Sequence, residues 1–258
     1  MKLDELPADV LCYITEYFEI GDDLNELINS HKFFRNIPQI REKQFIELSG
    51  NQSLKYYDML YGYIKKTPWF ENLKKCKLIL NLIHLNRNDV SQLGNVHTLY
   101  LSFCPNITDV SALGNVHTLY LSHCQNIRDV SALGNVHILD LSFCLNIRDV
   151  SALGNVHTLN LSFCDNITDV SALGNVHTLI LWRCQNITDV SALGNVHRLD
   201  LVGCPNITDV SALGNVHTLD LRGCANITDF SALGNVHTLY LLRFQINNTT
   251  MLKNTKII

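Results

Sequence analysis

The chain has 258 residues, 47% of them hydrophobic, and a formal charge of −4. No part of it carries the concentrated basic excess that nucleic-acid binding requires, so we expect no nucleic-acid partner. No stretch approaches eighteen consecutive apolar residues, and the acidic start MKLDELPADV lacks the basic and apolar regions of a secretory signal. We therefore expect no membrane association and a cytoplasmic location, with the nucleus as the alternative.

The first 35 residues predict two short amphipathic helices. Apolar residues recur at intervals of three and four from Leu6 to Phe18, and Gly21 ends this helix. A second helix begins at the acidic pair Asp22–Asp23, because carboxylates favour a helix N-terminus. Two helices this short cannot be stable alone, so they must cover each other and a partner.

The string LPADVLCYITEYFEIGDDLNELINSHKFFRNI resembles an F-box. The resemblance implies a small all-α F-box-like domain over residues 1–50 that docks on the Skp-type adaptor of a cullin ubiquitin ligase. It assigns adaptor binding to Leu6, Pro7, Val10, Leu11, Ile14, Phe18, Leu24 and Phe33. The alternative is a helical cap that only closes the repeats that follow.

Residues 37–66 predict two further helices that are separated near Gly50. The apolar residues of the first include Phe45 and Leu48. We expect residues 51–76 to form a helical linker and an aromatic cap, in which Trp69 and Phe70 cover the open end of the first repeat.

A twenty-residue repeat dominates the rest of the chain. The block LGNVH opens eight successive copies without insertion or deletion. Each copy has the spacing L-x-x-L-x-L-x-x-C-x-x-I, which is typical of a leucine-rich repeat. We predict an α/β leucine-rich-repeat solenoid over residues 77–245, with a parallel concave sheet and short convex turns. Residues 77–94 form a degraded first repeat whose strand is out of phase by one residue, and residues 246–258 form a C-terminal cap.

Each position of a repeat has an expected role. Leu99 faces the core, whereas Tyr100 and Ser102 face solvent, because side chains alternate along a strand. Asp109 caps a short helical turn, and Gly114 supplies a left-handed residue that ends it. The asparagines in the phase of Asn106 satisfy local backbone groups in the bend.

Two residue types recur at the same position of successive repeats, and we call such a set of equivalent residues a column. The cysteines predict reduced, buried core thiols, because no C-x-x-C pair supports a disulfide or metal ladder. They are Cys104, Cys124, Cys144, Cys164, Cys184, Cys204 and Cys224. The histidines that start at His97 are interpreted as packing residues, with metal binding or pH sensing as the alternative. We expect no catalytic group, no cofactor and no metal.

The columns that vary between repeats indicate a binding surface on a constant scaffold. We assign target binding to Tyr100, Phe103, Tyr120, His123, Asp140, Phe143, Asn160, Phe163, Trp182, Arg183, Asp200, Asp220, Arg222, Tyr240 and Arg243. Trp, Tyr and Arg are the residues that most often anchor interfaces. Neutral drift at tolerant exposed positions is the alternative.

The whole chain resembles an F-box protein with leucine-rich repeats, and its near-identical copies look like the expanded families of giant DNA viruses and some protists. The resemblance implies a non-enzymatic adaptor that recruits an unknown target protein to the ligase. We expect a monomer outside that complex. The alternative is a stand-alone repeat binding protein.

Overall fold

The computed structural model describes residues 45–48, 50–62, 77–242 and 255–258. The chain forms two compact units, Met1–Ile79 and Leu80–Ile258. The F-box-like segment with all eight predicted adaptor-binding residues lies outside the described residues, as do Trp69, Phe70 and Arg243.

The described part of the first unit contains strand β1 (Phe45–Leu48), helix α4 (Gly50–Leu60) and the start of strand β2 (Lys77–Asn81). The helix predicted over Phe45 and Leu48 was wrong. Phe45–Leu48 form a strand, in which Glu47 is exposed and Leu48 is buried. Helix α4 buries Tyr57 and ends before Gly62, whose φ of 75° is left-handed.

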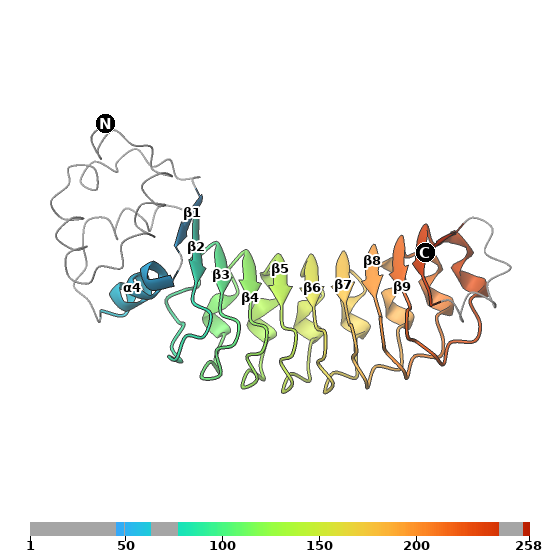
Figure 1. The fold of residues 1–258 in the computed structure, drawn as a ribbon, viewed down its shortest axis with the longest axis horizontal. Helices are drawn as coiled ribbons and strands as arrows, with labels where there is room; N and C mark the ends of the chain where they lie inside the picture. The colour runs from blue at the N-terminus through green and yellow to red at the C-terminus, as the bar shows by residue number, and fades with distance from the viewer. Residues whose placement is uncertain (1–44, 49, 63–76, 243–254) are drawn as a thin grey trace. The chain divides into compact units, whose positions relative to one another are not determined.

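The second unit is the predicted solenoid. Its short strands lie side by side in chain order within an eleven-stranded sheet, and their row curves gently in Figure 1. Neighbours from β3 to β11 pair in parallel, and every repeat adds one strand in the same register, as in Leu99 opposite Leu119. The strands are β3 (Thr98–Tyr100), β4 (Thr118–Tyr120), β5 (Ile138–Asp140), β6 (Thr158–Asn160), β7 (Thr178–Ile180), β8 (Arg198–Asp200), β9 (Thr218–Asp220), β10 (Thr238–Tyr240) and β11 (Lys256–Ile257).

A 3₁₀ helix forms the return half of each repeat. These helices are η3 (Ser111–Leu113), η4 (Ser131–Asn135), η5 (Ser151–Leu153), η6 (Ser171–Leu173), η7 (Ser191–Asn195), η8 (Ser211–Asn215) and η9 (Ser231–Asn235). Asp109 lies directly before this turn, and its Oδ1 accepts a hydrogen bond of 2.9 Å from the backbone N–H of Ser111. The N-cap residue is Val110, one position after the predicted Asp109, and it has no side-chain cap. Within twenty residues the turn is short, as the sequence indicates.

The core consists of the constant apolar columns. In the first full repeat Leu99, Leu101, Cys104, Ile107, Val110 and Leu113 are all buried, and so are their equivalents in the later copies wherever the structure describes them. The first strand was predicted to contribute Leu78, Leu80 and Leu82 one residue out of phase, and all three are buried. Since each repeat contacts only its neighbours, the core is a continuous column and not a centre.

The prediction for Gly114 was wrong. Gly114 has a right-handed φ of −61°, so it supplies no left-handed residue. It is required for close approach: a Cβ there would lie 2.3 Å from the carbonyl oxygen of Ala132 in the next repeat. The same contact recurs from Gly94 to Gly214 and keeps the turns tightly stacked.

Two polar ladders join each repeat to the one before it. The thiol of Cys124 donates to the carbonyl oxygen of Leu101 at 3.0 Å. The amide of Asn126 donates to the carbonyl oxygen of Pro105 at 2.7 Å. Asparagine was predicted to serve its own bend, but it binds the preceding repeat instead, and both patterns recur along the array.

Candidate functional site

The variable face of the sheet is the side opposite the leucines. We define it by the column that begins at Tyr100 and the column that begins at Ser102. At the N-terminal end the rings of Tyr100 and Tyr120 stack at 4.7 Å between centroids. Side chains of neighbouring copies therefore contact one another directly on this face.

Part of this face is more buried than predicted. Ser102, Ser142 and Ser162 are buried, although they were expected to face solvent. The hydroxyl of Ser122 donates to that of Ser102 at 2.9 Å, and the hydroxyl of Ser162 donates to Asn160 Oδ1 at 2.6 Å. Of this column, Trp182, Arg222 and Leu242 are exposed and accessible to a partner.

Aspartate and asparagine in the Tyr100 column have a structural task as well. In Asp140, Asn160, Asp200 and Asp220 one side-chain oxygen accepts the backbone N–H two residues ahead, where each strand enters its bend. This bond is an Asx turn. It leaves the second polar atom of each side chain for another contact.

An aromatic ladder runs along the bend that follows the strands. We define it as His84, Phe103, His123, Phe143 and Phe163, whose successive ring centroids lie 5.3, 4.4, 4.2 and 4.2 Å apart. The Phe103 side chain is 45% exposed. Four of these residues come from successive full repeats, which is why the rings stack at nearly the spacing of the strands.

Every residue of the aromatic ladder has a left-handed backbone. Their φ values lie between 58° and 64°, and Arg183, next in the column, has a φ of 55°. A non-glycine residue costs roughly 1–2 kcal/mol in this conformation. The next two copies place Gly203 and Gly223 at the same position, with φ values of 69° and 79°. The fold thus accepts glycine here, without that cost.

The ladder ends on a mixed cluster of Phe163, Trp182 and Arg183. The Trp182 ring meets Phe163 edge-on at 5.2 Å and is part of a side chain that is 43% exposed. The guanidinium carbon of Arg183 lies 5.8 Å from the Phe163 ring and 6.0 Å from the Trp182 ring. Such a cluster combines the side chains that most often anchor protein interfaces.

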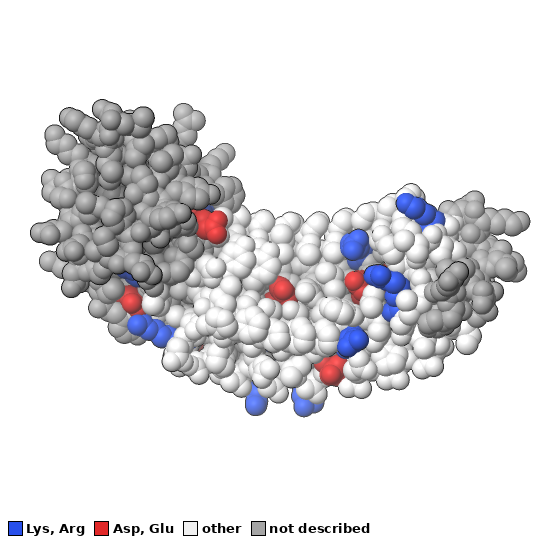
Figure 2. Space-filling model, viewed as in Figure 1, with Lys and Arg blue, Asp and Glu red and all other residues white. Residues whose placement is uncertain are grey.

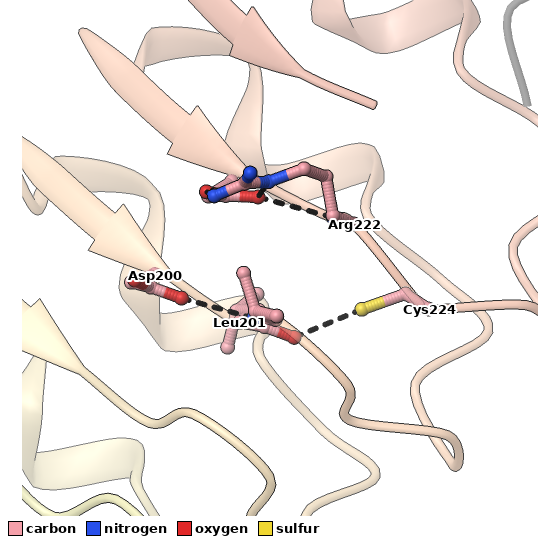
Figure 3. Close-up of polar contacts among 6 residues, drawn as sticks. Asp200, Leu201, Arg222 and Cys224 are labelled. Carbon is pink, nitrogen blue, oxygen red and sulfur yellow. Dashed lines mark hydrogen bonds and ion pairs between the residues drawn. The ribbon is translucent and has the colours of Figure 1, made fainter. Parts of the chain in front are cut away.

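Charged residues follow toward the C-terminal end. Arg222 binds Asp220 through Nε and Nη2, the shorter contact being 2.6 Å, and its guanidinium carbon lies 5.5 Å from the Tyr240 ring. Asp200 lies on the neighbouring strand, and its Oδ1 accepts a hydrogen bond from the backbone N–H two residues ahead (Figure 3). Burial raises the pKa of the Asp200 carboxyl. On the face of the array that Figure 2 shows, charged side chains are more frequent toward this end.

The structure brings the predicted target-binding residues into two adjoining strips. Tyr100, Tyr120, Asp140, Asn160, Asp200, Asp220 and Tyr240 lie in one strand column, and Trp182 and Arg222 lie two residues further along their own repeats. Phe103, His123, Phe143, Phe163 and Arg183 form the left-handed column.

The predicted set left out several members of these strips, among them His84 and Ile180. His84 stands nineteen residues before Phe103, the same offset that separates Leu82 from Leu101, so the shifted first strand was the available signal. Ile180 pairs with Asn160 on one side and Asp200 on the other, and it contributes an apolar position between them.

No family model matches this sequence, and no curated protein matches it. Among solved structures, the chain is similar to the internalin InlF of Listeria monocytogenes, with 21% identity and a TM-score of 0.47 over 75% of this chain and 70% of that one. It is similar to InlJ of the same species, with 20% identity and a TM-score of 0.39 over 75% and 51% of the two chains. A leucine-rich-repeat protein of Leptospira interrogans shows 16% identity and a TM-score of 0.39 over 72% and 67%. The leucine-rich-repeat architecture of this chain rests on its own register and core and not on these likenesses.

The histidine column is a continuous stack at the entrance of the strands. Successive rings from His97 to His237 lie 4.5–4.8 Å apart, and most Nδ1 atoms lie 3.0–3.3 Å from the hydroxyl of the following threonine. Lone pairs of imidazole nitrogens lie in the ring planes, so stacked rings do not converge on one ion. Among the described residues no group of three or more His, Cys, Asp or Glu could hold a metal.

The cysteine column lies in the core of the array. All seven thiols are free and buried, as predicted. Burial raises the pKa of Cys204 to about 11 and that of Cys164 to about 12. Because the thiolate is the reactive form, the thiols of Cys164 and Cys204 are poor nucleophiles at neutral pH. At Cys104 the hydrogen bond with Cys124 lowers the pKa instead, although this side chain is buried as well.

The turn side of the array carries a column of exposed aspartates. The backbone N–H and hydroxyl of Ser111 lower the pKa of Asp109. A shallow cavity of about 260 Å³ lies here between two repeats, lined by Thr108, Asp109, Ser111, Asp129, Ser131 and Ala132. The helices within the described ranges are all too short or too polar to span a bilayer.

Proposed function

We propose that the variable face and the aromatic ladder form a binding surface for a protein partner. The left-handed column carries this proposal, because non-glycine side chains occupy positions where Gly203 and Gly223 show that glycine suffices. Strained residues of this kind persist when something other than stability requires them.

Ring stacking alone is a weak explanation for these side chains. A stacked aromatic pair contributes roughly 0.5–1.5 kcal/mol beyond area burial, which about offsets the roughly 1–2 kcal/mol that each left-handed residue costs. Arg183 gains less, since an exposed cation–π contact contributes about 0.5–1 kcal/mol. Stability therefore gives little reason to keep a bulky side chain at this position, and least of all at Arg183.

The geometry of the ladder indicates the class of partner. Rings stacked at 4.2–4.4 Å hide their faces against each other and expose their edges. Nucleobases bind by stacking on open ring faces, which are covered between Phe103 and Phe163. Ring edges instead suit the apolar side chains and carbonyl oxygens of a protein.

Affinity capture with the full chain tests this proposal. In the test variant, Phe143→Gly and Phe163→Gly copy the glycines of later repeats, so we expect thermal stability within a few degrees of wild type and loss of bound protein. The matched control, His157→Ala with His177→Ala, removes two rings stacked at 4.6 Å from the strand entrance and should leave capture unchanged. Equal capture by both variants would refute the proposed surface.

The finer function rests on the resemblance of residues 1–50 to an F-box. We propose that this segment binds a Skp-type adaptor and that the array holds a target for a cullin ubiquitin ligase. Effective concentration would then be the contribution of this subunit, with no chemistry of its own. The order in the sequence, an F-box-like segment followed by repeats with an exposed variable surface, supports this assignment.

Co-expression with a Skp-type adaptor tests the ligase role. We expect the adaptor to co-purify with wild type and to be lost from a variant with Leu6→Ala and Ile14→Ala that retains the array. If the adaptor never co-purifies, or if the substitutions change only stability, the protein is a stand-alone repeat binder whose N-terminal helices cap the solenoid.

A further inference from the structure

The variable face of the sheet carries two carboxylates that form no ion pair among the described residues. Asp140 lies on β5 and Asp200 on β8. Each uses one oxygen for its Asx turn, at 2.8 Å to the N–H of Ser142 and 3.0 Å to that of Val202. In the described part of the chain, the ion pair between Arg222 and Asp220 involves neither of them.

The nearby arginines do not neutralise Asp200. The guanidinium of Arg222 donates three hydrogen bonds to Asp220 (Figure 3). Its guanidinium carbon also lies 5.5 Å from the centroid of the Tyr240 ring. Arg198 is exposed two residues earlier on the same strand; it lowers the pKa of Asp200 by attraction but forms no ion pair with it. Burial and the charge of Asp220 act in the opposite direction and leave the pKa of Asp200 raised.

Apolar and neutral side chains lie between the two carboxylates. The register places Asn160 and Ile180 on the intervening strands, in line with both acids. The Trp182 side chain, 43% exposed, follows Ile180 on the same repeat. A partner that crosses these strands therefore meets an acid, then a neutral and apolar stretch, then a second acid.

The spacing of the acids restricts the partner further. Asp140 and Asp200 are three strand steps apart, about 14 Å at roughly 4.8 Å per strand. An extended chain advances about 3.4 Å per residue, so four residues span about 14 Å. Residues i and i+4 of an extended segment also point to the same side.

We propose that the variable face binds an extended protein segment with two basic residues four positions apart. One basic residue would bind Asp140 and the other Asp200, and an apolar residue midway between them would lie over Asn160 and Ile180. This inference rests on the proposed protein-binding function and names the chemistry of its partner. The long stems of lysine or arginine suit the site, because they pack along apolar surface while the charged head reaches a carboxylate.

Peptide display against the immobilised full chain tests the proposal. The probe is a random twelve-residue peptide library, and we expect enrichment of sequences with Lys or Arg at positions i and i+4 around an apolar residue. Asp140→Asn and Asp200→Asn should each weaken binding of an enriched peptide by about three- to tenfold. Asparagine preserves the Asx turn, as Asn160 shows by accepting the N–H of Ser162 at 3.0 Å.

The control is Asp169→Asn on the turn side. It removes the same charge from a residue with the same bond to the N–H two residues ahead, and peptide binding should not change. A double variant with Asp140→Lys and Asp200→Lys should instead select acidic peptides.

Three results would contradict the proposal. Peptides that lose binding in the Phe143→Gly, Phe163→Gly variant but tolerate both asparagine variants would leave the protein-binding surface intact and overturn the basic motif. An equal loss with Asp169→Asn would show an unspecific charge effect and also overturn it. Failure to enrich any peptide sensitive to the phenylalanine substitutions would overturn both the motif and the proposed surface.

Discussion

A Cβ atom on Gly154 would lie 2.4 Å from the carbonyl oxygen of Ala172 in the following repeat. Contact at this distance forces backbone to move, and overpacking costs roughly 1–3 kcal/mol. We therefore expect Gly154→Ala to lower the free energy of unfolding by at least that amount, as measured by urea denaturation.

Gly234 provides the matched control for this substitution. It belongs to the last 3₁₀ helix of the described residues, and an added Cβ there would meet no atom of the described part of the chain within 4 Å. Gly234→Ala should be neutral or stabilise by up to about 1 kcal/mol. Similar destabilisation in the two variants would contradict the close-approach explanation.

The column cysteines should resist alkylation until the array unfolds. The pKa of Cys204 is raised to about 11 by burial, so its thiolate is scarce at neutral pH. In a chain with Cys12→Ser and Cys76→Ser, we expect almost no iodoacetamide labelling at pH 7.5 and seven labels in denaturant. Rapid labelling of the native chain, read by intact mass, would disprove the buried column.

The turn-side aspartates predict a loss of stability in acid. The backbone N–H and hydroxyl of Ser131 lower the pKa of Asp129 below its ordinary value of 3.8. A lowered carboxyl pKa stabilises the fold above the unfolded-state value, and this contribution disappears as pH falls through the folded value. In melting curves from pH 5 to 2.5, Asp129→Asn should show a shallower loss than wild type while keeping the cap.

Histidine protonation should also weaken the array, but at higher pH. Burial and its neighbours His197 and His237 lower the pKa of His217 below 6.5. The unfolded chain therefore binds a proton before the folded chain does, and stability falls as pH drops below about 6.5. His217→Gln should flatten the pH dependence of the melting temperature between pH 7.5 and 5. A profile equal to that of wild type would count against repulsion within the column.

Arg183 should lower the free energy of unfolding relative to glycine at the same position. Its φ of 55° is unfavourable for any side chain, and its contacts with Phe163 and Trp182 are long, at 5.8 and 6.0 Å. We expect Arg183→Gly to raise the free energy of unfolding by up to about 1 kcal/mol and to weaken partner capture. A destabilised Arg183→Gly variant would mean that the cation–π contacts outweigh the backbone strain.

The constant columns made most of the array predictable from the sequence. A fixed period of twenty with Leu99, Leu101 and Cys104 in phase leaves only one way to bury these residues, namely a stack in register. Identical copies also place the same side chains at the same depth, so the buried thiols followed from composition and spacing alone.

The errors concern residues with more than one physical explanation. Glycine signals either a left-handed backbone or a close approach, and the constant Gly114 required the second. The true left-handed position was obscured by Phe103 and its equivalents, although Gly203 and Gly223 in that column were a visible signal. The burial of Ser102 depends on the side chains of neighbouring strands, which alternation along one strand does not describe.

The hydrogen bonds of the two polar ladders all run in the same direction along the array. Every column thiol and every column asparagine donates toward the N-terminal neighbour, as Cys124 does to Leu101 and Asn126 to Pro105. Removing repeats from the C-terminal end leaves carbonyl oxygens without these donors, whereas cutting from the N-terminal end leaves the thiol and the amide of the new first repeat without their carbonyl acceptors. Water can replace the acceptor of the exposed asparagine, but a thiol that stays buried loses its hydrogen-bond partner. The two ends of the solenoid are therefore chemically different. A repeat added at the C-terminal end supplies donors to carbonyl oxygens that the preceding repeat already presents.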